Sequence, residues 1–436
     1  MTSNSESAAE AGVEGQMAGG AATPDQPVSG ADRIVSLDFI RGIAILGILF
    51  ANITAFGQPF TAYYWPPAIT GGANAVDNTW WLFQFVFIDG KFRGLFTLLF
   101  GAGLYLFMEK AWARGSSRWL QARRLAWLLL FGLIHFFLIW MGDILTLYAV
   151  WGIVALSLLK LKRKTQLVAG ITILSFGTLL ITLMMGSQFA AANIESVRAQ
   201  LTPEQSQQIA TVEERTFKDV QEELAIYRDG SYGDIVAHQL GEAGQMFQTV
   251  LFVGPVETLG LILIGISLFR YGLFSGGLDR RKMISWGWTG VISGCVLATL
   301  MGLWPYASGF PFFTTMFVFN GLGQLPHLIT VLGLVSLLAA WAPSAAQTPL
   351  GQRFVAAGRM AFSNYLGTSI LMIFVFHGWA LGLYGQFHRL ALFGVVAVVW
   401  MLMLFWSKWW LARFRYGPLE WCWRCLTYWT LFPIKR

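Results

Sequence analysis

The apolar residues of this 436-residue chain lie in blocks separated by short clusters of Lys and Arg. Each block has about 20 residues, enough for a helix to cross the ~30 Å hydrocarbon core of a bilayer. Only 12% of all residues are charged, against roughly 25% in soluble domains, so the chain cannot supply the polar surface of two or three soluble domains. The blocks therefore predict an all-α, polytopic membrane protein and exclude soluble enzyme classes.

We expect about ten transmembrane helices and one or two re-entrant or interfacial helices. The aromatic segment 78–90 runs into charged residues and is typical of an interfacial or re-entrant helix. Pro305, Gly309 and Pro311 suggest a similar piece before the eighth span. The expected spans are residues 34–56, 91–108, 123–141, 143–160, 166–187, 249–270, 283–304, 315–341, 360–380 and 390–411.

Most Lys and Arg fall on one side of these spans. This bias predicts that both termini are cytoplasmic in a bacterial inner membrane. It also accounts for the positive net charge without a nucleic-acid partner. The acidic outer loop either covers an active-site mouth or is an insertion without chemistry. The segments expected from this scheme are a disordered cytoplasmic tail (1–32), an N-terminal helix block with a polar cavity (33–187), the extracytoplasmic acidic loop (188–248), a C-terminal helix block (249–411) and a basic, aromatic cytoplasmic tail (412–436).

Ionisable residues within a span are costly unless they are paired or face a cavity, so each is a functional candidate. Arg41 lies in the first span, one helical turn after Asp38, and the two can form a structural ion pair. Asn52 returns to nearly the same face ~16 Å further along the helix. This stripe suits a polar cavity that crosses most of the membrane.

The third and fourth spans form a tight hairpin with His135 before the turn, Asp143 in it and Tyr148 after it. A neutral His in the membrane can act as a general base if a carboxylate orients it. The alternative is a His that only hydrogen-bonds within a helix interface. Tyr365, Ser369 and His377 give the ninth span further polar groups.

Five sequence blocks resemble the YeiB-like family of bacterial inner-membrane proteins, which has been described as a domain of unknown function. They are LDFIRGIAILGILFANI, GKFRGLFTLLFGAGLYL, GLIHFFLIWMGDILTLYAVWG, GRMAFSNYLGTSIL and YGPLEWCWRCLTY. This family is in turn similar to transmembrane acyltransferases, including acyltransferase family 3 and heparan-alpha-glucosaminide N-acetyltransferase. Family 3 carries an Arg and a His in its first span; Arg41 matches the Arg, but Asn52 stands in place of the His. The heparan enzyme has its catalytic His later, where this chain has Tyr63.

The resemblance implies transfer of an acyl group, expected to be acetyl, from a cytoplasmic CoA donor to an acceptor sugar, lipid or small molecule. His135 then replaces the missing base, with Asp143 orienting it and Asn52 stabilising an oxyanion. Arg41 and Asn52 would line the channel for the donor, with Tyr148, Tyr365, Ser369 and His377 as further contacts. Arg123, Arg124 and Arg359 would hold CoA phosphates. Cys422 and Cys425 lack the partners of a four-ligand zinc site, so no metal is expected.

Two other functions fit the same residues. A transporter or flippase for a small metabolite or lipid would use the polar cavity without chemistry. A sensor or assembly factor would instead act through the outer loop. The expected partners are the lipid bilayer, an acyl-CoA and an unidentified acceptor, and a homodimer is compatible with the sequence because apolar surfaces facing lipid and protein look alike.

Overall fold

Residues 34–436, which the computed structural model describes, form helices and no β-sheet, as the apolar blocks predict. The predicted tail 1–32 lies outside the described residues. Short non-α turns are also present: 3₁₀ at Phe60–Tyr63 and Pro66–Ala68, and π-helical at His135–Ile139, Thr249–Leu259 and Phe317–Leu322. The α-helices are α1 (Val35–Gly57), α2 (Ala75–Phe87), α3 (Lys91–Ala113), α4 (Arg118–Ile134), α5 (Leu145–Leu158), α6 (Arg163–Asn193), α7 (Glu195–Arg198), α8 (Pro203–Asp229), α9 (Tyr232–Gly241), α10 (Ala243–Gln248), α11 (Gly260–Arg270), α12 (Arg280–Ala307), α13 (Phe312–Met316), α14 (Gln324–Ala345), α15 (Pro349–Arg359), α16 (Ala361–Phe376), α17 (Arg389–Arg413) and α18 (Pro418–Tyr428).

Eight helical stretches within residues 34–436 are long and apolar enough to cross a membrane, and α15 with α16 makes a ninth if that pair, bent by 82°, is one span. The expected number was about ten. Helix α5 accounts for the difference between ten and nine spans, because its 14 residues are only ~21 Å long, too short to cross the hydrocarbon core. The re-entrant piece expected before the eighth span is wrong, because α13 continues through a π-helical turn into α14 as one stretch, Phe312–Ala345.

Helix α2 leads into α3 as expected, and Val76, Phe83 and Phe87 on one of its faces are exposed. It packs against α12 and α17, and its Trp81 and Phe85 are fully buried. Other helices thus cover one aromatic face of α2, while its opposite face stays exposed, and the interfacial or re-entrant helix remains a prediction.

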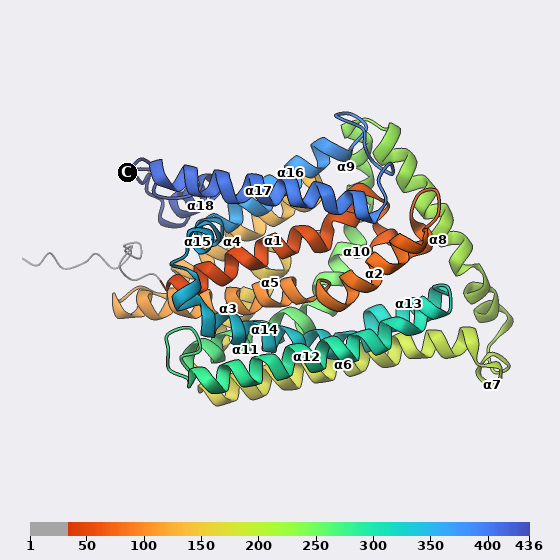
Figure 1. The fold of residues 1–436 in the computed structure, drawn as a ribbon, viewed down its shortest axis with the longest axis horizontal. Coiled ribbons are helices and arrows are strands. Elements are labelled where there is room, and N and C mark those ends of the chain that lie inside the picture. The colour runs from red at the N-terminus through yellow and green to blue at the C-terminus, as the bar shows by residue number, and fades with distance from the viewer. Residues whose placement is uncertain (1–33) are drawn as a thin grey trace, which may run out of the picture.

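Helix α1 runs through the centre of the bundle (Figure 1), in contact with α3 and with α14 to α17. In its most apolar window 83% of residues are buried, against 17% for the peripheral α6. Two glycines bring α1 against α15. A Cβ on Gly42 would lie 1.9 Å from the carbonyl oxygen of Phe354, and one on Gly358 would lie 1.9 Å from that of Asp38. Small residues permit this close backbone approach, which places Arg41 and Arg359 beside each other's helix.

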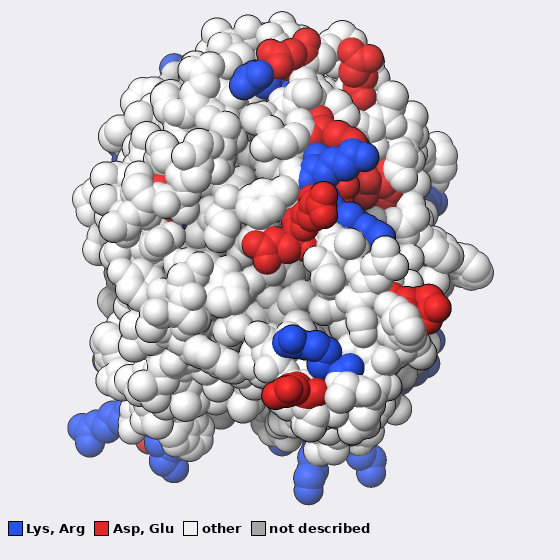
Figure 2. Space-filling view, turned by 90° about the vertical axis from the view of Figure 1, so that its right-hand side faces the viewer, with Lys and Arg blue, Asp and Glu red and all other residues white. Residues whose placement is uncertain are grey.

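The start of α1 and the C-terminus lie at the same end of the bundle, with α18, and we call this the α18 end (Figure 1). Helix α8 crosses the opposite end, the α8 end. The segment predicted as the outer loop, 188–248, is built around this one helix of 27 residues, and α6 continues to Asn193. Figure 2 looks onto the α8 end and shows acidic and basic side chains gathered in one band, with most of the remaining face uncharged.

Candidate functional site

A cavity of about 310 Å³ opens among α1, α3, α4, α5, α15, α16, α17 and α18. On α1 its lining extends as far as Arg41. Leu128 of α4 and Leu145 and Tyr148 of α5 also line it. Helix α18, which the sequence predicts only as part of a basic tail, forms one wall with Glu420, Trp423 and Arg424. The cavity therefore leads from the α18 end into the bundle.

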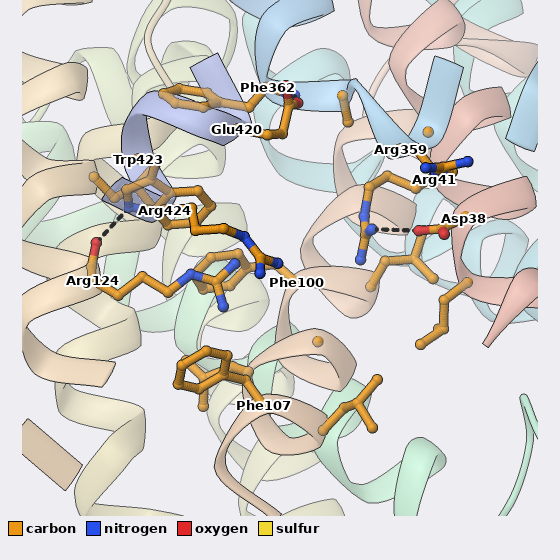
Figure 3. A pocket seen from close by; sticks show the side chains of 18 of the residues that line it. Asp38, Arg41, Phe100, Phe107, Arg124, Arg359, Phe362, Glu420, Trp423 and Arg424 are labelled. Atoms are coloured by element: carbon orange, nitrogen blue, oxygen red, sulfur yellow. Dashed lines mark hydrogen bonds and ion pairs between the residues drawn. The ribbon is translucent and has the colours of Figure 1, made fainter. Parts of the chain in front are cut away.

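Arginine dominates the polar lining of this cavity. Arg41, Arg124, Arg359, Arg415 and Arg424 line it, while the only lining carboxylates from residues 34–436 are Asp38 and Glu420. In Figure 3, Arg124 and Arg424 lie on one side and Arg41 and Arg359 on the other.

The two carboxylates are outnumbered by the five arginines, and each is bound to a neighbouring group. Asp38 Oδ1 lies 3.0 Å from Arg41 Nη1. Glu420 accepts hydrogen bonds from the backbone N–H groups of Phe362 and Ser363 at 2.8 and 3.1 Å, and from the Ser363 hydroxyl. Burial raises the pKa of Glu420 above its ordinary value. The cavity is thus a cationic environment suited to an anionic ligand.

Arg124 is held by aromatic rings rather than by a carboxylate. Its guanidinium carbon lies 4.1 Å from the ring centroid of Trp423 and 4.8 Å from that of Phe107. The Trp423 indole N–H also donates to the Arg124 carbonyl at 2.8 Å. No carboxylate of residues 34–436 forms an ion pair with Arg124. Stacking fixes the guanidinium plane and leaves its N–H donors available to phosphate oxygens.

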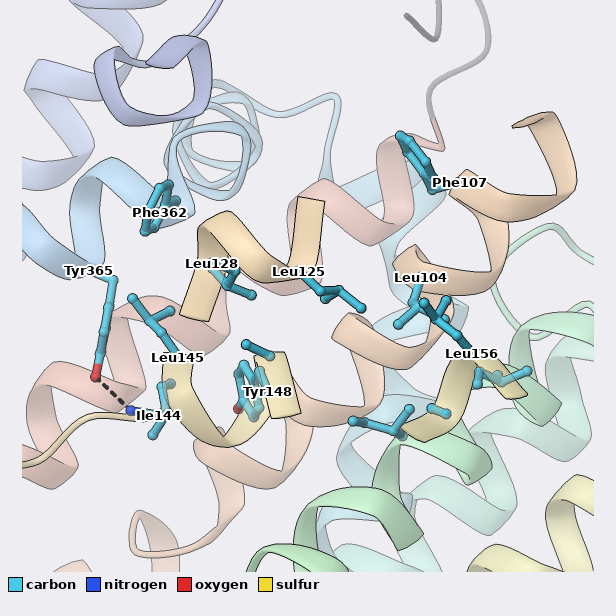
Figure 4. Close-up of a cluster of buried hydrophobic side chains, with 14 of the residues drawn as sticks. Leu104, Phe107, Leu125, Leu128, Ile144, Leu145, Tyr148, Leu156, Phe362 and Tyr365 are labelled. Carbon is cyan, nitrogen blue, oxygen red and sulfur yellow. Dashed lines mark hydrogen bonds between the residues drawn. The ribbon is translucent and has the colours of Figure 1, made fainter. Parts of the chain in front are cut away.

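Apolar side chains close the inner end of the cavity. Leu128, Leu145 and Tyr148 line it there and belong to the buried cluster drawn in Figure 4. Ile45 and Ile48 of α1 fill the same cluster, so the cavity does not continue along α1 to Asn52. The predicted stripe of Arg41 and Asn52 along one cavity is therefore wrong: Asn52 is half-buried outside it.

Beyond this apolar layer, the structure brings together His135 and Asp143. The Nδ1 atom of His135 lies 3.0 Å from Asp143 Oδ1, and His135 is completely buried. Asp143 also accepts from the backbone N–H groups of Leu145 at 3.1 Å and Thr146 at 2.7 Å, so it caps the start of α5. Close packing of the hairpin makes this contact, because a Cβ on Gly132 would lie 2.6 Å from the backbone nitrogen of Thr146.

The second nitrogen of His135 meets a residue that is distant in sequence. Nε2 lies 2.9 Å from the hydroxyl oxygen of Ser369 on α16. Tyr365, one turn before Ser369, packs its ring 5.0 Å from the His135 ring. The Tyr365 hydroxyl donates to the Gly142 carbonyl at 3.2 Å and accepts from the Ile144 N–H at 3.3 Å (Figure 4). The group Asp143, His135, Ser369 and Tyr365 is called the histidine centre below.

Two other predicted contacts lie apart from both the cavity and the histidine centre. Arg123 points its guanidinium to the Trp429 ring, 6.0 Å away. His377 lies at the far end of α16, with its ring 5.0 Å from that of Tyr227 on α8.

A second, smaller cavity of about 50 Å³ lies among α3, α6, α14 and the π-helical turn before α11. Arg93 and Glu257 form an ion pair of 2.6 Å in its wall, and His327 also lines it. Thr97 lines this cavity too, and its hydroxyl lies 2.8 Å from that of Tyr148, which lines the larger cavity. A single hydrogen bond thus bridges the walls of the two cavities.

Several cavity residues were not anticipated from the sequence. Trp423, Arg424 and Glu420 lie on α18, and Phe107 lies near the end of α3. The available signal was the alternation of aromatic and charged residues in YGPLEWCWRCLTY, which is unusual for a solvated tail.

The sequence is 32% identical over 401 residues to the "Uncharacterized protein YeiB" of Escherichia coli (strain K12), covering 91% of this chain and 96% of that protein. The chain belongs to the YeiB-like family. The "Uncharacterized protein YxaH" of Bacillus subtilis (strain 168) is 31% identical over 428 residues, 94% of this chain and 98% of its own. No solved structure matches.

The family model described as "Protein of unknown function (DUF418)" matches residues 268–430. In this YeiB-like chain the matched part carries α15 to α18, and hence Arg359, Ser369, Glu420 and Trp423. The remaining site residues, including Arg41, Arg124 and His135, lie in the part that the full-length relatives cover.

Proposed function

We propose that this YeiB-like protein is an acyltransferase that takes an acyl group, in the simplest case acetyl, from a CoA thioester. The arginine-lined cavity binds the phosphates of the donor, and its phosphopantetheine arm extends toward Leu145 and Tyr148. The acceptor is a hydroxyl or amine of a sugar, lipid or small molecule that reaches the histidine centre from the α8 end. The α18 end then faces the cytoplasm of a bacterial inner membrane, in line with the excess of Lys and Arg there.

The observation that carries this proposal is the pairing of a cationic cavity with a buried, oriented imidazole. Five arginines line the cavity against two carboxylates. Leu145 of its inner wall is two residues from Asp143, which holds His135 at 3.0 Å. His135 accepts the proton of the attacking group and returns it to the leaving group, while the Asp143 carboxylate stabilises the imidazolium that forms in between.

The test is acetyl-CoA binding and slow hydrolysis by purified protein in detergent, with wild type compared with His135→Ala. His238→Ala, a half-buried His on α9, is the matched control. Binding is expected in all three proteins. Release of free CoA is expected to fall by about 100-fold or more only in His135→Ala, the lower range for loss of a general base. Equal turnover in the two variants would remove His135 as the base.

A transporter or flippase is the second candidate, and the link between the two cavities favours it. The Arg93–Glu257 ion pair and the Thr97–Tyr148 hydrogen bond continue the polar path beyond the arginine-lined cavity. Ionisable groups at such depth mark substrate or proton pathways in many membrane proteins. Absence of binding at millimolar acetyl-CoA would overturn the acyltransferase and favour this function.

A further inference from the structure

The histidine centre has a third member that general base catalysis alone does not require. Asp143, His135 and Ser369 form an unbroken chain of side-chain contacts at 3.0 and 2.9 Å, contributed by three separate segments. All three side chains are at least nine-tenths buried. A carboxylate, an imidazole and a hydroxyl in this order are the arrangement that activates a serine for attack on an acyl carbonyl.

The hydrogen bonds around Asp143 decide where the His135 proton lies. Both carboxylate oxygens accept backbone N–H groups, at 3.1 Å from Leu145 and 2.7 Å from Thr146, which favours the ionised carboxylate. A carboxylate can only accept, so Nδ1 of His135 must carry a proton. In the neutral imidazole, Nε2 is then an acceptor facing the Ser369 hydroxyl. The Ser369 oxygen is also 3.2 Å from the Tyr365 carbonyl, but Nε2 is nearer.

We propose, on the basis of the acyltransferase function above, that Ser369 is a nucleophile that carries the acyl group as an ester between donor and acceptor. Its position suits this role. Ser369 is near the middle of the 16-residue α16, whose first residues border the cavity at the α18 end and whose last residue precedes His377 near α8. An ester at this depth allows the acyl group to be received from a donor on one side of the membrane and transferred to an acceptor on the other.

Tyr365 is part of the apolar layer between the cavity and Ser369. Phe362, Tyr365 and Ser369 are spaced by three and four residues, so they form one stripe on α16. Phe362 lines the cavity, and Ser369 touches His135. Tyr365 lies between them and is anchored only by its hydroxyl contacts to Gly142 and Ile144 and by its packing. Rotation of the Tyr365 ring opens the path for the thioester.

The two half-reactions balance without another reactant. In the first, the Ser369 proton passes to His135 Nε2 while the Ser369 oxygen attacks the thioester carbon. The thiolate leaves, takes that proton and departs as CoA–SH. In the second, the acceptor gives its proton to His135 Nε2 and attacks the ester carbon. The Ser369 oxygen leaves and recovers the proton, so the resting enzyme is restored.

The test is to incubate the full chain with radiolabelled acetyl-CoA and no acceptor, quench with acid, and map the label by peptide mass spectrometry. We expect a hydroxylamine-labile ester on the peptide that contains Ser369. Ser369→Ala should abolish the label and retain acetyl-CoA binding, and His135→Ala should reduce labelling by about 100-fold. Ser369→Cys, which preserves shape, should form a thioester at the same position. Ser336→Ala is the matched control, because Ser336 is a buried helical serine bound only to the Met283 carbonyl at 2.9 Å.

The outcomes separate this proposal from the function on which it rests. Acetyl-CoA binding with His135-dependent turnover, no label on wild type and an active Ser369→Ala variant would overturn the nucleophile and keep the acyltransferase, with direct transfer to the acceptor. Label on another residue would also overturn it. No binding of acetyl-CoA at all would overturn the acyltransferase itself.

Discussion

The arginines that line the cavity and the single buried Arg389 differ in their surroundings. The cavity at the α18 end gathers five arginines around open volume. Near the other end of the bundle, Arg389 at the start of α17 is only 3% exposed, and no cavity adjoins it among those described above. Its Nη1 donates to Gln84 at 2.7 Å and Thr54 at 3.3 Å, and its Nη2 donates to the carbonyls of Ala62 and Tyr63.

The Arg389 cluster is therefore a structural junction, whereas the five cavity arginines adjoin open volume that a ligand can enter. The backbone N–H of Arg389 also donates to Asp77 at 3.0 Å, and His388 lies 2.6 Å from the same carboxylate. These contacts tie α17 to α1, α2 and the Phe60–Tyr63 turn. A buried charge alone does not identify a functional site. A more specific sign of a functional site is a group of arginines that outnumbers the neighbouring carboxylates and lines an open cavity.

The largest effect expected from this difference is on stability. Arg389→Met removes the cation and leaves the oxygens of Gln84, Ala62 and Tyr63 without their donor. Leaving a buried hydrogen-bonding group without its partner typically costs about 1–3 kcal/mol for each group. We expect a much lower thermal midpoint in detergent, followed by tryptophan fluorescence, and a lower yield of folded protein.

Arg413→Met is the control for this experiment, because Arg413 is an exposed residue at the other end of the same helix. Its substitution should leave the midpoint within the range of ordinary surface changes, about 0.5 kcal/mol. If Arg389→Met were as stable as Arg413→Met, the distinction between a structural junction and a ligand-binding cavity would not hold.

A smaller effect, on binding rather than stability, is expected in the cavity. Arg124→Gln keeps a polar side chain but removes the charge that lies between Trp423 and Phe107. A hydrogen bond to a charged group is worth about 1.5–3 kcal/mol, so acetyl-CoA affinity should fall by roughly 10- to 100-fold. The thermal midpoint without ligand should change little, since a lost cation–π contact costs about 1 kcal/mol.

Titration calorimetry with acetyl-CoA and with CoA lacking the acyl group checks this prediction. Both ligands should lose the same affinity, because Arg124 is proposed to contact phosphate rather than the acyl group. A loss confined to acetyl-CoA would place Arg124 near the thioester instead. Arg123→Gln is the neighbouring control, since Arg123 faces Trp429 rather than the cavity.

The sequence predicts the fold class and one local contact, but it does not predict how distant segments meet. His135 and Asp143 are eight residues apart across a tight turn, so hairpin geometry alone brings them within reach. Ser369 lies 234 residues from His135 in the chain, and only the packing of α16 on the π-helical turn His135–Ile139 joins them. The prediction that Asn52 shares a cavity with Arg41 did not hold for the same reason. Helix periodicity places Asn52 on a face of α1, but the packing of Ile45 and Ile48 in the buried cluster closes the cavity before that point.

A third buried ionisable group lies on α8 itself. The Glu223 carboxylate on α8 accepts from the Phe60 N–H at 2.9 and 3.1 Å and from the Tyr384 hydroxyl at 2.9 Å. These bonds attach α8 to the loops that follow α1 and α16. Burial raises the pKa of Glu223 to about 7, an effect that its hydrogen bonds with Phe60 and Tyr384 oppose and the negative charge of Glu242 assists.

The pH dependence follows from the sign of this shift and is the smallest effect expected. An unfolded Glu has a pKa of about 4.3, so the folded state holds its proton more tightly. The stabilisation is complete below that pH and is lost as the pH rises through about 7, the pKa in the folded protein. The slope for one proton is at most about 1.4 kcal/mol per pH unit. We expect the thermal midpoint to fall between pH 5 and pH 8 in wild type.

Glu223→Gln should remove this slope, because the amide resembles the protonated acid and can still accept from Tyr384. Glu222→Gln, on an exposed neighbouring side chain, should keep it. The comparison then extends to all three regions. The Arg389 guanidinium is held by neutral oxygens of the surrounding segments. The arginine-lined cavity has open volume beside its guanidinium groups. Burial favours the protonated form of Glu223. A wild-type midpoint that is flat or rises with pH would contradict the last of these, and would assign the attachment of α8 to the apolar contacts of Leu224 and Tyr227 alone.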